Sequence, residues 1–406
     1  MKHNLYNFKL LTLTLLTIWS ISGNAQTFKT NAQLLKTIDA NYLSGVAQYK
    51  VMMNLLEGDR FPKTFDVITG KLVTSDSGWW CSGFYPGTLL ELYAKTKDPV
   101  LLTETNRILG HLVKEQYNTT THDLGFMMYC SFGNALMNDP KPEYKAVLLN
   151  SAKSLSTRFD PKIGCIKSWD SKKKEFLVII DNMMNLELLF WATRTTGDSS
   201  YYKIAVTHAN TTMKNHFRPD YSSYHVINYD PETGAVQKKQ TAQGYADESA
   251  WARGQAWGLY GYTVMYRETH DQRYLDQANH IASFILNHPN LPKDKIPYWD
   301  FNAPNIPNAL RDASAAAVMS SALFELAHYA GKKEANTYFK AAEKMLQSLS
   351  AAPYQSLPGT NGGFLLQHSV GHLPQHSEVD VPLTYADYYY VEAMKRYETI
   401  NSLKLQ

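Results

Sequence analysis

Cysteine is scarce in this sequence of 406 residues, which contains three, Cys81, Cys130 and Cys165. The number is odd, and the spacing matches neither a CxxC pair nor the Cys/His pattern of a zinc site. A disulfide framework and a cysteine-based metal centre are therefore not expected. No other pattern indicates a metal or a cofactor, and we predict none.

A strong charge of either sign is also missing. The sequence has 40 Lys and Arg residues against 37 Asp and Glu residues, which gives a formal net charge of +3. No long run of Lys or Arg provides the basic surface that nucleic-acid binding requires. We predict no nucleic-acid partner, whereas a small anionic substrate is compatible with this balance.

Long apolar stretches are confined to the N-terminus. Residues 1–10 carry the positive charge of a signal-peptide n-region, and the apolar stretch after them ends in small residues, with Ala25 before Gln26. This pattern predicts a cleavable signal peptide over residues 1–25 and a periplasmic or secreted protein. The stretch is too short to be favoured as a membrane span, and no later stretch approaches the required length. We predict no membrane span.

Apolar and aromatic residues, by contrast, are abundant, at 44% and 13% of the chain, with 27 Tyr and 8 Trp. This content supports a large core, and an excess of amphipathic rings is usual in clefts that stack against sugars. Residues 75–87, SDSGWWCSGFYPG, gather Trp79, Trp80, Phe84 and Tyr85 among small residues. They are interpreted either as a cleft wall or as an aromatic cluster of the core.

Helical patterning recurs along the chain. Polar turns separate an apolar helical stretch from a more amphipathic one at Asp98, Asp139, Asp198, Asp271 and Lys332. With a helix near residues 31–56 and a terminal helix in YADYYYVEAMKRYETI, this makes about six helical hairpins. We predict an all-α fold, an (α/α)6 barrel in which the hairpins close into a ring.

The inner helices of such a ring are expected to be apolar nearly all round and the outer helices amphipathic, with loops at one end lining a pocket. Residues 185–195 and 314–326 are candidate inner helices. No linker rich in Pro, Gly or Ser divides the chain. Residues 26–406 are therefore predicted to form a single domain.

Asp181 lies at the entrance of a predicted helix. It follows the apolar run 177–180 and precedes a helical pattern of apolar residues that begins at Met184. An Asp at this position can cap the helix through its carboxylate. Held beside apolar and aromatic neighbours, it can also have its pKa raised enough to act as a catalytic acid. The two roles are compatible.

Other polar residues occur where the helical periodicity is interrupted. They are His122 and Asp123 in THDLGF, His225 in SSYHVINYDPETG, Gln243 in AQGYADES and Arg253 in WARGQAW. A lone His is more often structural than catalytic, and an Arg can simply cap or pair with a helix end. Asp300, Asp312 and Asp387 are expected to be loop or cap residues.

Taken together, these motifs resemble one family, the unsaturated glucuronyl hydrolases, glycoside hydrolase family 88. The resemblance extends from about residue 76 to residue 397 and is carried, in order, by WWCSGFYPG, HDLGF, IIDNMMNL, YHVINYDPETG, WARGQAWGLYG, PYWDF, RDASAAA and ADYYYVEA. It implies an (α/α)6 catalytic domain. The substrate it implies is an oligosaccharide whose non-reducing end is the 4,5-unsaturated uronic acid left by polysaccharide lyases.

The resemblance also implies roles for individual residues. Asp181 matches the family's general acid/base, and Asp123 matches its second essential carboxylate. The positions that match substrate contacts are Trp80, His122, His225, Lys239, Thr241, Gln243, Arg253 and Trp257. Ser369 and Tyr385 are weaker candidates, because the family's C-terminal recognition loop aligns poorly with this sequence.

The chemistry of such a substrate agrees with these roles. An unsaturated uronate is an enol ether, so protonation at C4 by Asp181 places cationic character on C5 and O5, where water can add. A guanidinium fork at Arg253 suits the substrate carboxylate, and Trp80 and Trp257 can supply stacking faces. Because cleavage follows hydration, the carboxylate spacing that distinguishes retaining from inverting glycosidases need not apply.

Lys238 and Lys239 lie just before the Gln243 motif. If both face the sugar on the reducing side of the scissile bond, they predict a preference for sulfated substrates. If both are solvated, they are ordinary surface charge.

Three other functions are compatible with the same fold. The chain could be an unsaturated rhamnogalacturonyl hydrolase, a polysaccharide lyase, or a glycan-binding protein without catalysis. The presence of both Asp123 and Asp181 argues against the last. A lyase creates the ultraviolet chromophore of the unsaturated sugar and a hydrolase of this type destroys it, so the sign of the absorbance change separates these two classes.

Overall fold

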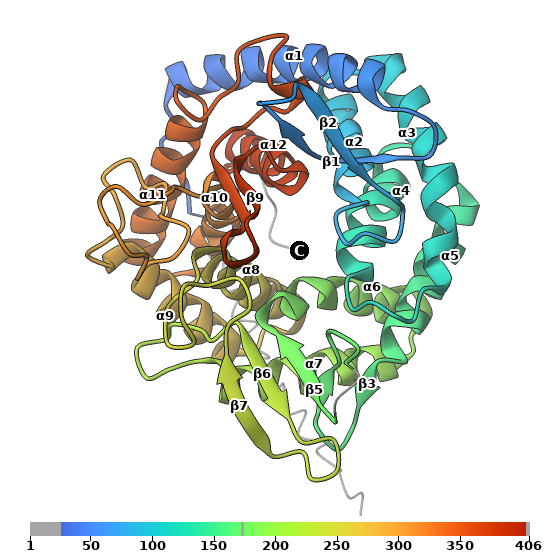
Figure 1. The fold of residues 1–406 in the computed structure, drawn as a ribbon, viewed down its shortest axis with the longest axis vertical. Coiled ribbons are helices and arrows are strands. Elements are labelled where there is room, and N and C mark those ends of the chain that lie inside the picture. The colour runs from blue at the N-terminus through green and yellow to red at the C-terminus, as the bar shows by residue number, and fades with distance from the viewer. Residues whose placement is uncertain (1–25, 172–173, 403–406) are drawn as a thin grey trace, which may run out of the picture.

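The computed structural model describes residues 26–171 and 174–402, and they form a closed ring of helices (Figure 1). The inner helices are α2 (Phe84–Thr96), α4 (Asn134–Asn138), α6 (Leu186–Thr196), α8 (Ala252–Thr269), α10 (Ala313–Tyr329) and α12 (Thr384–Thr399). The outer helices are α1 (Ala32–Leu55), α3 (Pro99–Leu112), α5 (Pro142–Ser156), α7 (Ser199–His216), α9 (Gln272–Asn287) and α11 (Lys332–Leu349).

The ring closes where α12 packs against both α2 and α1. Each of α2, α4, α6, α8 and α10 is followed along the chain by its outer partner, and α12 completes the sixth pair with α1. The (α/α)6 barrel predicted from the helical repeats is confirmed. The shortest inner helix, α4, is extended at its N-terminal end by a π-helix, η2 (Gly125–Gly133).

Burial explains the difference between inner and outer helices. Every residue of α10 from Ala313 to Ala327 is buried, and its many Ala and Ser residues allow neighbouring helices to approach closely. The outer helix α11 buries one face only, with Tyr338, Ala342 and Met345 at helical spacing. The inner helices predicted at 185–195 and 314–326 correspond to α6 and α10.

The polar turns predicted between paired helices are also present. Asp98, Asp198 and Asp271 are the N-caps of α3, α7 and α9, and each carboxylate accepts a hydrogen bond from the backbone N–H two residues later. Asp139 ends α4, and Lys332 begins α11. The turn residues thus satisfy helix-end amides that would otherwise lack partners.

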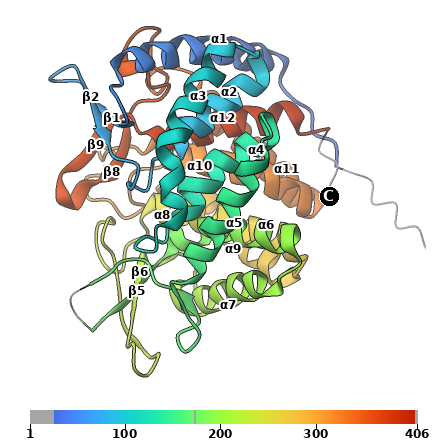
Figure 2. The same ribbon diagram turned by 90° about the vertical axis from the view of Figure 1, so that its right-hand side faces the viewer.

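Nine short strands form four small antiparallel sheets in the described residues, in loops that the sequence only sparsely marked as strand. They are β1 (Phe61–Asp66) with β2 (Lys71–Ser75), β3 (Phe159–Asp160) with β4 (Cys165–Ile166), β5 (Phe176–Ile179) with β6 (Val226–Tyr229) and β7 (Val236–Gln240), and β8 (Ser369–His372) with β9 (Ser377–Val381). Each sheet contributes strands just before an inner helix, and Figure 2 shows the strands gathered at one end of the ring.

Four short 3-10 helices complete the fold: η1 (Val113–Tyr117), η3 (Ile180–Asn185), η4 (Asn361–Gly363) and η5 (Leu373–Gln375). Within the described parts of the chain, no helix is both long and apolar enough to cross a membrane. The predicted signal peptide, residues 1–25, lies outside the described residues. The assignment of residues 26–406 to a single domain stays a prediction. The three cysteines are free thiols.

Candidate active site

A cavity of about 450 Å³ lies at the end of the ring where the inner helices begin. Its wall includes residues that precede or open several inner helices: Trp80 before α2, Asp123 before η2, Asp181 before α6, Arg253 in the first turn of α8 and Tyr385 in the first turn of α12. The positive ends of these helix dipoles therefore face the same space, which favours an anionic ligand. The volume suits a small saccharide.

Asp181 is held between a sheet and a helix. Strand β5 ends at Ile179, the N–H of Ile180 donates to the carbonyl of His225 at 3.0 Å, and Asp181 is the second residue of η3. The residue is 8% exposed, and its Oδ2 has no hydrogen-bond partner in the protein. The N-cap position of η3 is taken by Ile179 and not by Asp181. Of the two roles open to Asp181, the structure therefore favours a group kept for a ligand.

Burial raises the pKa of Asp181 to about 7, and the nearby charge of Asp123 adds to the effect. Arg253 acts in the opposite direction, as does the indole N–H of Trp257. The carboxyl group can therefore hold or release a proton near neutral pH, which is the property required of a general acid/base.

The second carboxylate is fixed to the first through a close backbone contact. Asp123 precedes Gly125, and a Cβ at Gly125 would collide with the backbone of Asn185 in η3. The N–H of Phe126 donates to Oδ1 of Asn185 at 2.9 Å. The THDLGF and IIDNMMN segments are thereby locked together, and each carries one of the two carboxylates.

Asp123 itself is 9% exposed, and the side chains of Thr121 and His122 lie beside its carboxylate. Thr121 donates to its Oδ2 at 3.0 Å, and Nε2 of His122 lies 3.2 Å from its Oδ1. The other ring nitrogen of His122, Nδ1, donates to the carbonyl of Ser168 at 2.9 Å. Burial lowers the pKa of His122 below its ordinary value, although Asp123 opposes the shift. His122 and Asp123 both line the cavity, as predicted.

The tautomer of His225 is determined by two backbone groups. The N–H groups of Ala242 and Gln243 both donate to Nδ1, each at 3.2 Å, so Nδ1 carries no proton. Burial lowers the pKa of His225 well below its ordinary value, and the proton of the neutral ring therefore resides on Nε2. That atom lies 3.7 Å from Oδ2 of Asp181. Gln243, which lines the cavity, thus supports the site through its backbone.

Arg253 is buried and already partly engaged by the protein. Its Nη1 donates to the carbonyl of Val370 at 2.5 Å and to Asp312 at 3.2 Å, and its Nη2 donates to the carbonyl of Gly371 at 2.7 Å. These bonds use three of the five guanidinium N–H groups. The remaining N–H groups, on a residue that lines the cavity, can still receive a carboxylate.

The expected cap and loop residues support this region. Asp312 caps α10 by accepting from the N–H groups of Ser314 and Ala315, and it also pairs with Arg253. Asp300 accepts from Ser249 at 2.6 Å. Asp387 accepts from the N–H groups of Leu365 and Leu366. These three carboxylates are structural, as predicted from the sequence.

The two tryptophans differ. Trp80 lines the cavity and is half-buried, with its ring 4.8 Å from that of Tyr385, so it can offer a face to a sugar. Trp257 is fully buried against Phe126 and Tyr389. The prediction that Trp257 is a stacking face is therefore wrong, because its ring is covered by other rings. It acts on the site through its indole N–H.

Of the two interpretations of Lys238 and Lys239, the structure favours ordinary surface charge. Both residues lie on β7, where successive side chains point to opposite faces. Lys238 pairs with Asp247 at 3.2 Å, and Lys239 lies over the ring of Tyr224 at 5.1 Å. Neither lysine lines the cavity.

Thr241 is likewise not among the residues that line the cavity. Its hydroxyl accepts a hydrogen bond from the N–H of Gly244 at 2.8 Å. The residue shapes the turn that brings Gln243 to His225, so its position matters to the site although its side chain does not reach the cavity.

Buried polar atoms without a protein partner are concentrated around the cavity. They include Oδ2 of Asp181, Nε2 of His122, Nε2 of His225, Nε1 of Trp257, Nδ1 of His372, Oε1 of Glu378, the hydroxyl of Tyr385 and Oγ of Ser369. Such atoms are costly unless a ligand or water satisfies them. The two weak candidates, Ser369 and Tyr385, are both in this set. No group of three or more His, Cys, Asp or Glu residues arranged to hold a metal occurs in residues 26–171 and 174–402.

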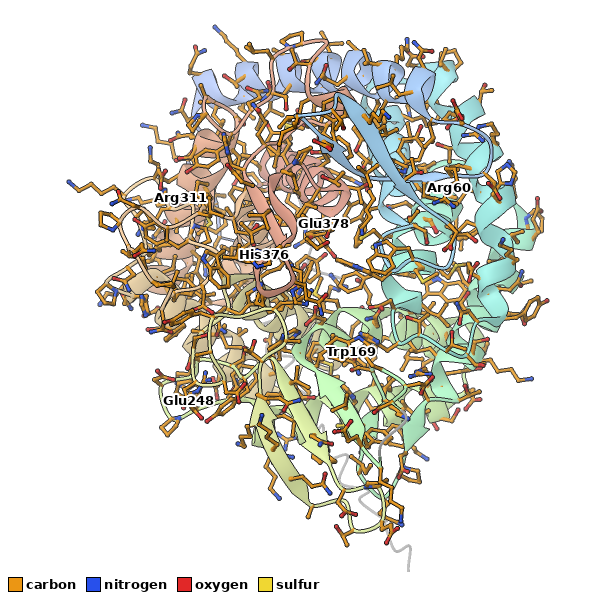
Figure 3. All side chains as sticks on the ribbon, in the orientation of Figure 1. Arg60, Trp169, Glu248, Arg311, His376 and Glu378 are labelled. Atoms are coloured by element: carbon orange, nitrogen blue, oxygen red, sulfur yellow. The ribbon has the colours of Figure 1, made fainter. Side chains whose placement is uncertain are left out.

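The structure adds residues that the sequence did not single out. Lys63, Trp169, His372 and Glu378 also line the cavity. Figure 3 shows Glu378 and Trp169 on opposite sides of the central opening of the ring. Trp169 comes from a short segment before β5, and Glu378 from β9. Lys63, His372 and Glu378 lie on the short strands β1, β8 and β9, which the sequence only sparsely marked, so no motif indicated these residues.

The Glycosyl Hydrolase Family 88 model matches residues 57–399, and the chain belongs to this family. An unsaturated glucuronyl hydrolase of Formosa agariphila is 44% identical over 95% of this chain and 96% of its own length. An unsaturated chondroitin disaccharide hydrolase of Streptococcus pneumoniae is 34% identical, covering 83% of this chain and 85% of that protein. The crystal structure of an unsaturated glucuronyl hydrolase specific for heparin has a TM-score of 0.87 and 46% identity, covering 91% of this chain and 99% of that one.

The fold, the site and these relatives together define a glycosidase of the unsaturated glucuronyl hydrolase type. It releases the 4,5-unsaturated uronic acid from the non-reducing end of oligosaccharides that lyases generate.

Proposed function

We propose that the protein releases this sugar by hydrating its C4=C5 double bond, with Asp181 as general acid/base. The observation that carries the proposal is a buried carboxyl group with a pKa of about 7 and an unpartnered Oδ2 in the cavity wall, beside the guanidinium of Arg253. The N–H groups of Arg253 that remain after its protein contacts hold the substrate carboxylate, and the inner-helix N-termini add to the attraction.

In this reaction Asp181 first donates a proton and later recovers one. The protonated carboxyl group donates its proton to C4, and the electron pair of the double bond forms the new C4–H bond. Positive charge develops on C5 and O5. Water then adds to C5 and returns a proton to the Asp181 carboxylate. The resulting hemiketal opens, and the hemiacetal at C1 releases the remaining sugar as an alcohol.

The neighbouring residues support these steps without forming a covalent intermediate. The Nε2–H of His225 points toward Oδ2 of Asp181 and favours its ionised form after proton transfer. Asp123, held by the hydrogen bond from Thr121, supplies negative charge beside the developing cation and can orient the attacking water. In this account Asp123 is an electrostatic and positioning group.

A carbon-linked analogue of the substrate tests the hydration step. In this analogue CH2 replaces the glycosidic oxygen, so the bond to the second sugar cannot be hydrolysed. Hydration of C4=C5 is still possible, and the ultraviolet absorbance of the unsaturated uronate should fall on incubation with the enzyme. If the enzyme binds the analogue but the absorbance persists, cleavage does not proceed through hydration.

For the substrate class we propose unsaturated disaccharides of the heparin type. The supporting observation is the 46% identity to the heparin-specific enzyme, against 34% to the chondroitin disaccharide hydrolase. Values of kcat/KM for unsulfated heparin-type and chondroitin-type disaccharides should favour the heparin type. A higher value for the chondroitin type would contradict this proposal and would identify chondroitin-type disaccharides as the preferred substrate.

We also propose that the protein is exported and loses residues 1–25. The proposal rests on the basic start, the apolar stretch and the small residues before Gln26. N-terminal sequencing of protein from its native source should begin at or near Gln26. Retention of residues 1–25 on the functional protein would contradict it.

A further inference from the structure

A buried arginine behind the cavity wall uses all of its donors on the protein. Arg158 follows the C-cap of α5, and its side chain is 6% exposed. Its Nε donates to the carbonyl of Lys167 at 2.9 Å, Nη1 to the carbonyl of Thr119 at 2.7 Å, and Nη2 to the carbonyl of Ser168 at 3.2 Å. Nη1 and Nη2 also reach the carboxylate of Asp170, at 3.4 and 3.3 Å. All five guanidinium N–H groups are therefore engaged, and none is left for a ligand.

These bonds join two segments of the cavity wall. Thr119 lies in the loop that carries His122 and Asp123, both of which line the cavity. Ser168 precedes Trp169, which lies at the side of the central opening (Figure 3). A lysine could not make the same connections, because an ammonium group has three donors and no planar fork.

The carbonyl of Ser168 determines the tautomer of His122. It accepts one hydrogen bond from Nη2 of Arg158 and another from Nδ1 of His122, the latter at 2.9 Å. Because a carbonyl oxygen can only accept, Nδ1 carries the proton of the neutral ring and Nε2 keeps a lone pair. Nε2 is buried without a hydrogen-bond partner and lies 3.2 Å from Oδ1 of Asp123. Two acceptors thus stand side by side in the cavity wall, an arrangement suited to an O–H donor.

The charges around His122 favour the neutral ring. Burial lowers its pKa, and the positive charge of Arg158 acts in the same direction. Asp123 and the hydrogen bond to the Ser168 carbonyl oppose these effects. The other groups nearby are an ion pair beside Arg158 and two buried histidines with lowered pKa values: Lys167 with Asp170, and His208 and His225. Removal of the Arg158 charge should therefore raise the pKa of His122.

We infer that Arg158 is a positioning residue for the reaction: it fixes the Ser168 carbonyl and thereby presents Nε2 of His122 to the cavity as a hydrogen-bond acceptor. With Asp123, this acceptor receives an O–H group, either of the attacking water or of a sugar hydroxyl. A doubly protonated ring would present an N–H instead, and the acceptor would be lost. This inference rests on the function proposed above.

The first test measures the tautomer of His122 in the parent protein. Nitrogen NMR spectroscopy of protein labelled in its histidine rings distinguishes the two ring nitrogens, and the signal of His122 is identified by its absence from His122→Asn. At neutral pH, Nδ1 should be protonated and Nε2 should not. A proton on Nε2 would overturn the inference. No substrate is needed, so this result does not depend on the proposed function or on whether an Arg158 variant folds.

The second test compares Arg158→Gln with Arg107→Gln. Arg107, on α3, also binds a carboxylate through its fork and a backbone carbonyl, those of Glu104 and Gly58, but it does not line or support the cavity. Arg158→Gln should lower kcat/KM by about tenfold to a hundredfold, because the acceptor is displaced. Arg107→Gln should leave kcat/KM unchanged.

The pH dependence separates positioning from a general loss of structure. In Arg158→Gln the NMR signal of His122 should titrate at a higher pH than in the parent, and the acid limb of kcat/KM should move to higher pH with it. A purely structural role would lower kcat/KM by the same factor at every pH and leave the His122 titration in place. That outcome, or an equal effect of Arg107→Gln, would overturn the inference. Absence of turnover by the parent would instead contradict the proposed function, and the titration of His122 would still decide the role of Arg158.

Discussion

Asp181 acquires its chemistry from its surroundings. An exposed Asp is ionised at neutral pH, but burial between β5, α8 and the cavity raises the pKa of this one to about 7. The sequence indicated the residue, because it stands at the junction of an apolar run and a helix. Its burial and its unpartnered Oδ2 could not be predicted, since they depend on His225 and Trp257, which are distant along the chain.

The raised pKa of Asp181 predicts the pH dependence of activity. The group must hold a proton before it can protonate C4, so kcat/KM should be high below about pH 7 and should fall as pH rises through that value. The descending limb in a plot of log kcat/KM against pH measures this directly. A profile that stays flat from mildly acidic to mildly alkaline pH would show that another group supplies the proton.

At the scale of elements, the site depends on contacts between segments that the sequence reveals one by one. The HDLGF and IIDNMMN motifs were identifiable, but their attachment through Gly125 and Asn185 was not, because it joins residues about sixty positions apart. The sequence did not mark β7 as a strand, and VQKKQ shows no alternation of apolar residues. It pairs with β6 through its backbone, and the strand geometry then separates Lys238 from Lys239.

A substitution at Gly125 tests the junction of these two segments. Gly125→Ala places a methyl group against the backbone of Asn185, so either η2 or η3 must move and the two carboxylates must separate. We expect a loss of stability of about 1 to 3 kcal/mol and a larger proportional loss of kcat/KM. Chemical denaturation and kinetics with the same preparation measure both.

Gly110 provides the matched control. It lies on the exposed side of α3, and a Cβ there meets no atom within 4 Å. Gly110→Ala should leave activity unchanged and stabilise the helix by about 0.5 to 1 kcal/mol. Equal behaviour of the Gly125 and Gly110 variants would contradict the proposed lock between the two segments.

At the scale of the whole molecule, the catalytic cavity and a network of ion pairs that stabilises the ring lie at opposite ends of the ring. The two ends differ: the N-terminal ends of the inner helices surround the cavity, and the C-terminal halves of α8, α10 and α12 carry Arg267, Glu325 and Arg396. Glu325 is buried and pairs with both arginines, which lower its pKa against the effect of burial. The ring itself was predictable because helical repeats are local patterns. This ion network was not, because its members come from three distant helices.

Because the network lies away from the cavity, a substitution in it should lower the stability of the protein and leave its catalytic activity unchanged. Glu325→Gln removes the carboxylate that Arg267 and Arg396 share, although Arg267 keeps Glu187 and Arg396 keeps Glu392, so it should lower the free energy of unfolding by about 1 to 3 kcal/mol. Activity per folded molecule should be unchanged, because Glu325 is at the other end of the ring. Glu232→Gln, which breaks the exposed pair with Lys174, should change stability by less than about 1 kcal/mol. A Glu325→Gln protein as stable as the parent would contradict this assignment.

The most direct test of the account is the ultraviolet absorbance of an unsaturated heparin-type disaccharide incubated with the parent protein and with Asp181→Asn. The parent should remove the absorbance. Asp181→Asn keeps the shape of the side chain but cannot transfer the proton, so its rate should fall by about 10²- to 10⁴-fold or more while its unfolding transition stays close to that of the parent. A rate within a few-fold of the parent, or an absorbance that rises, would contradict the role of Asp181 as the acid that starts the reaction.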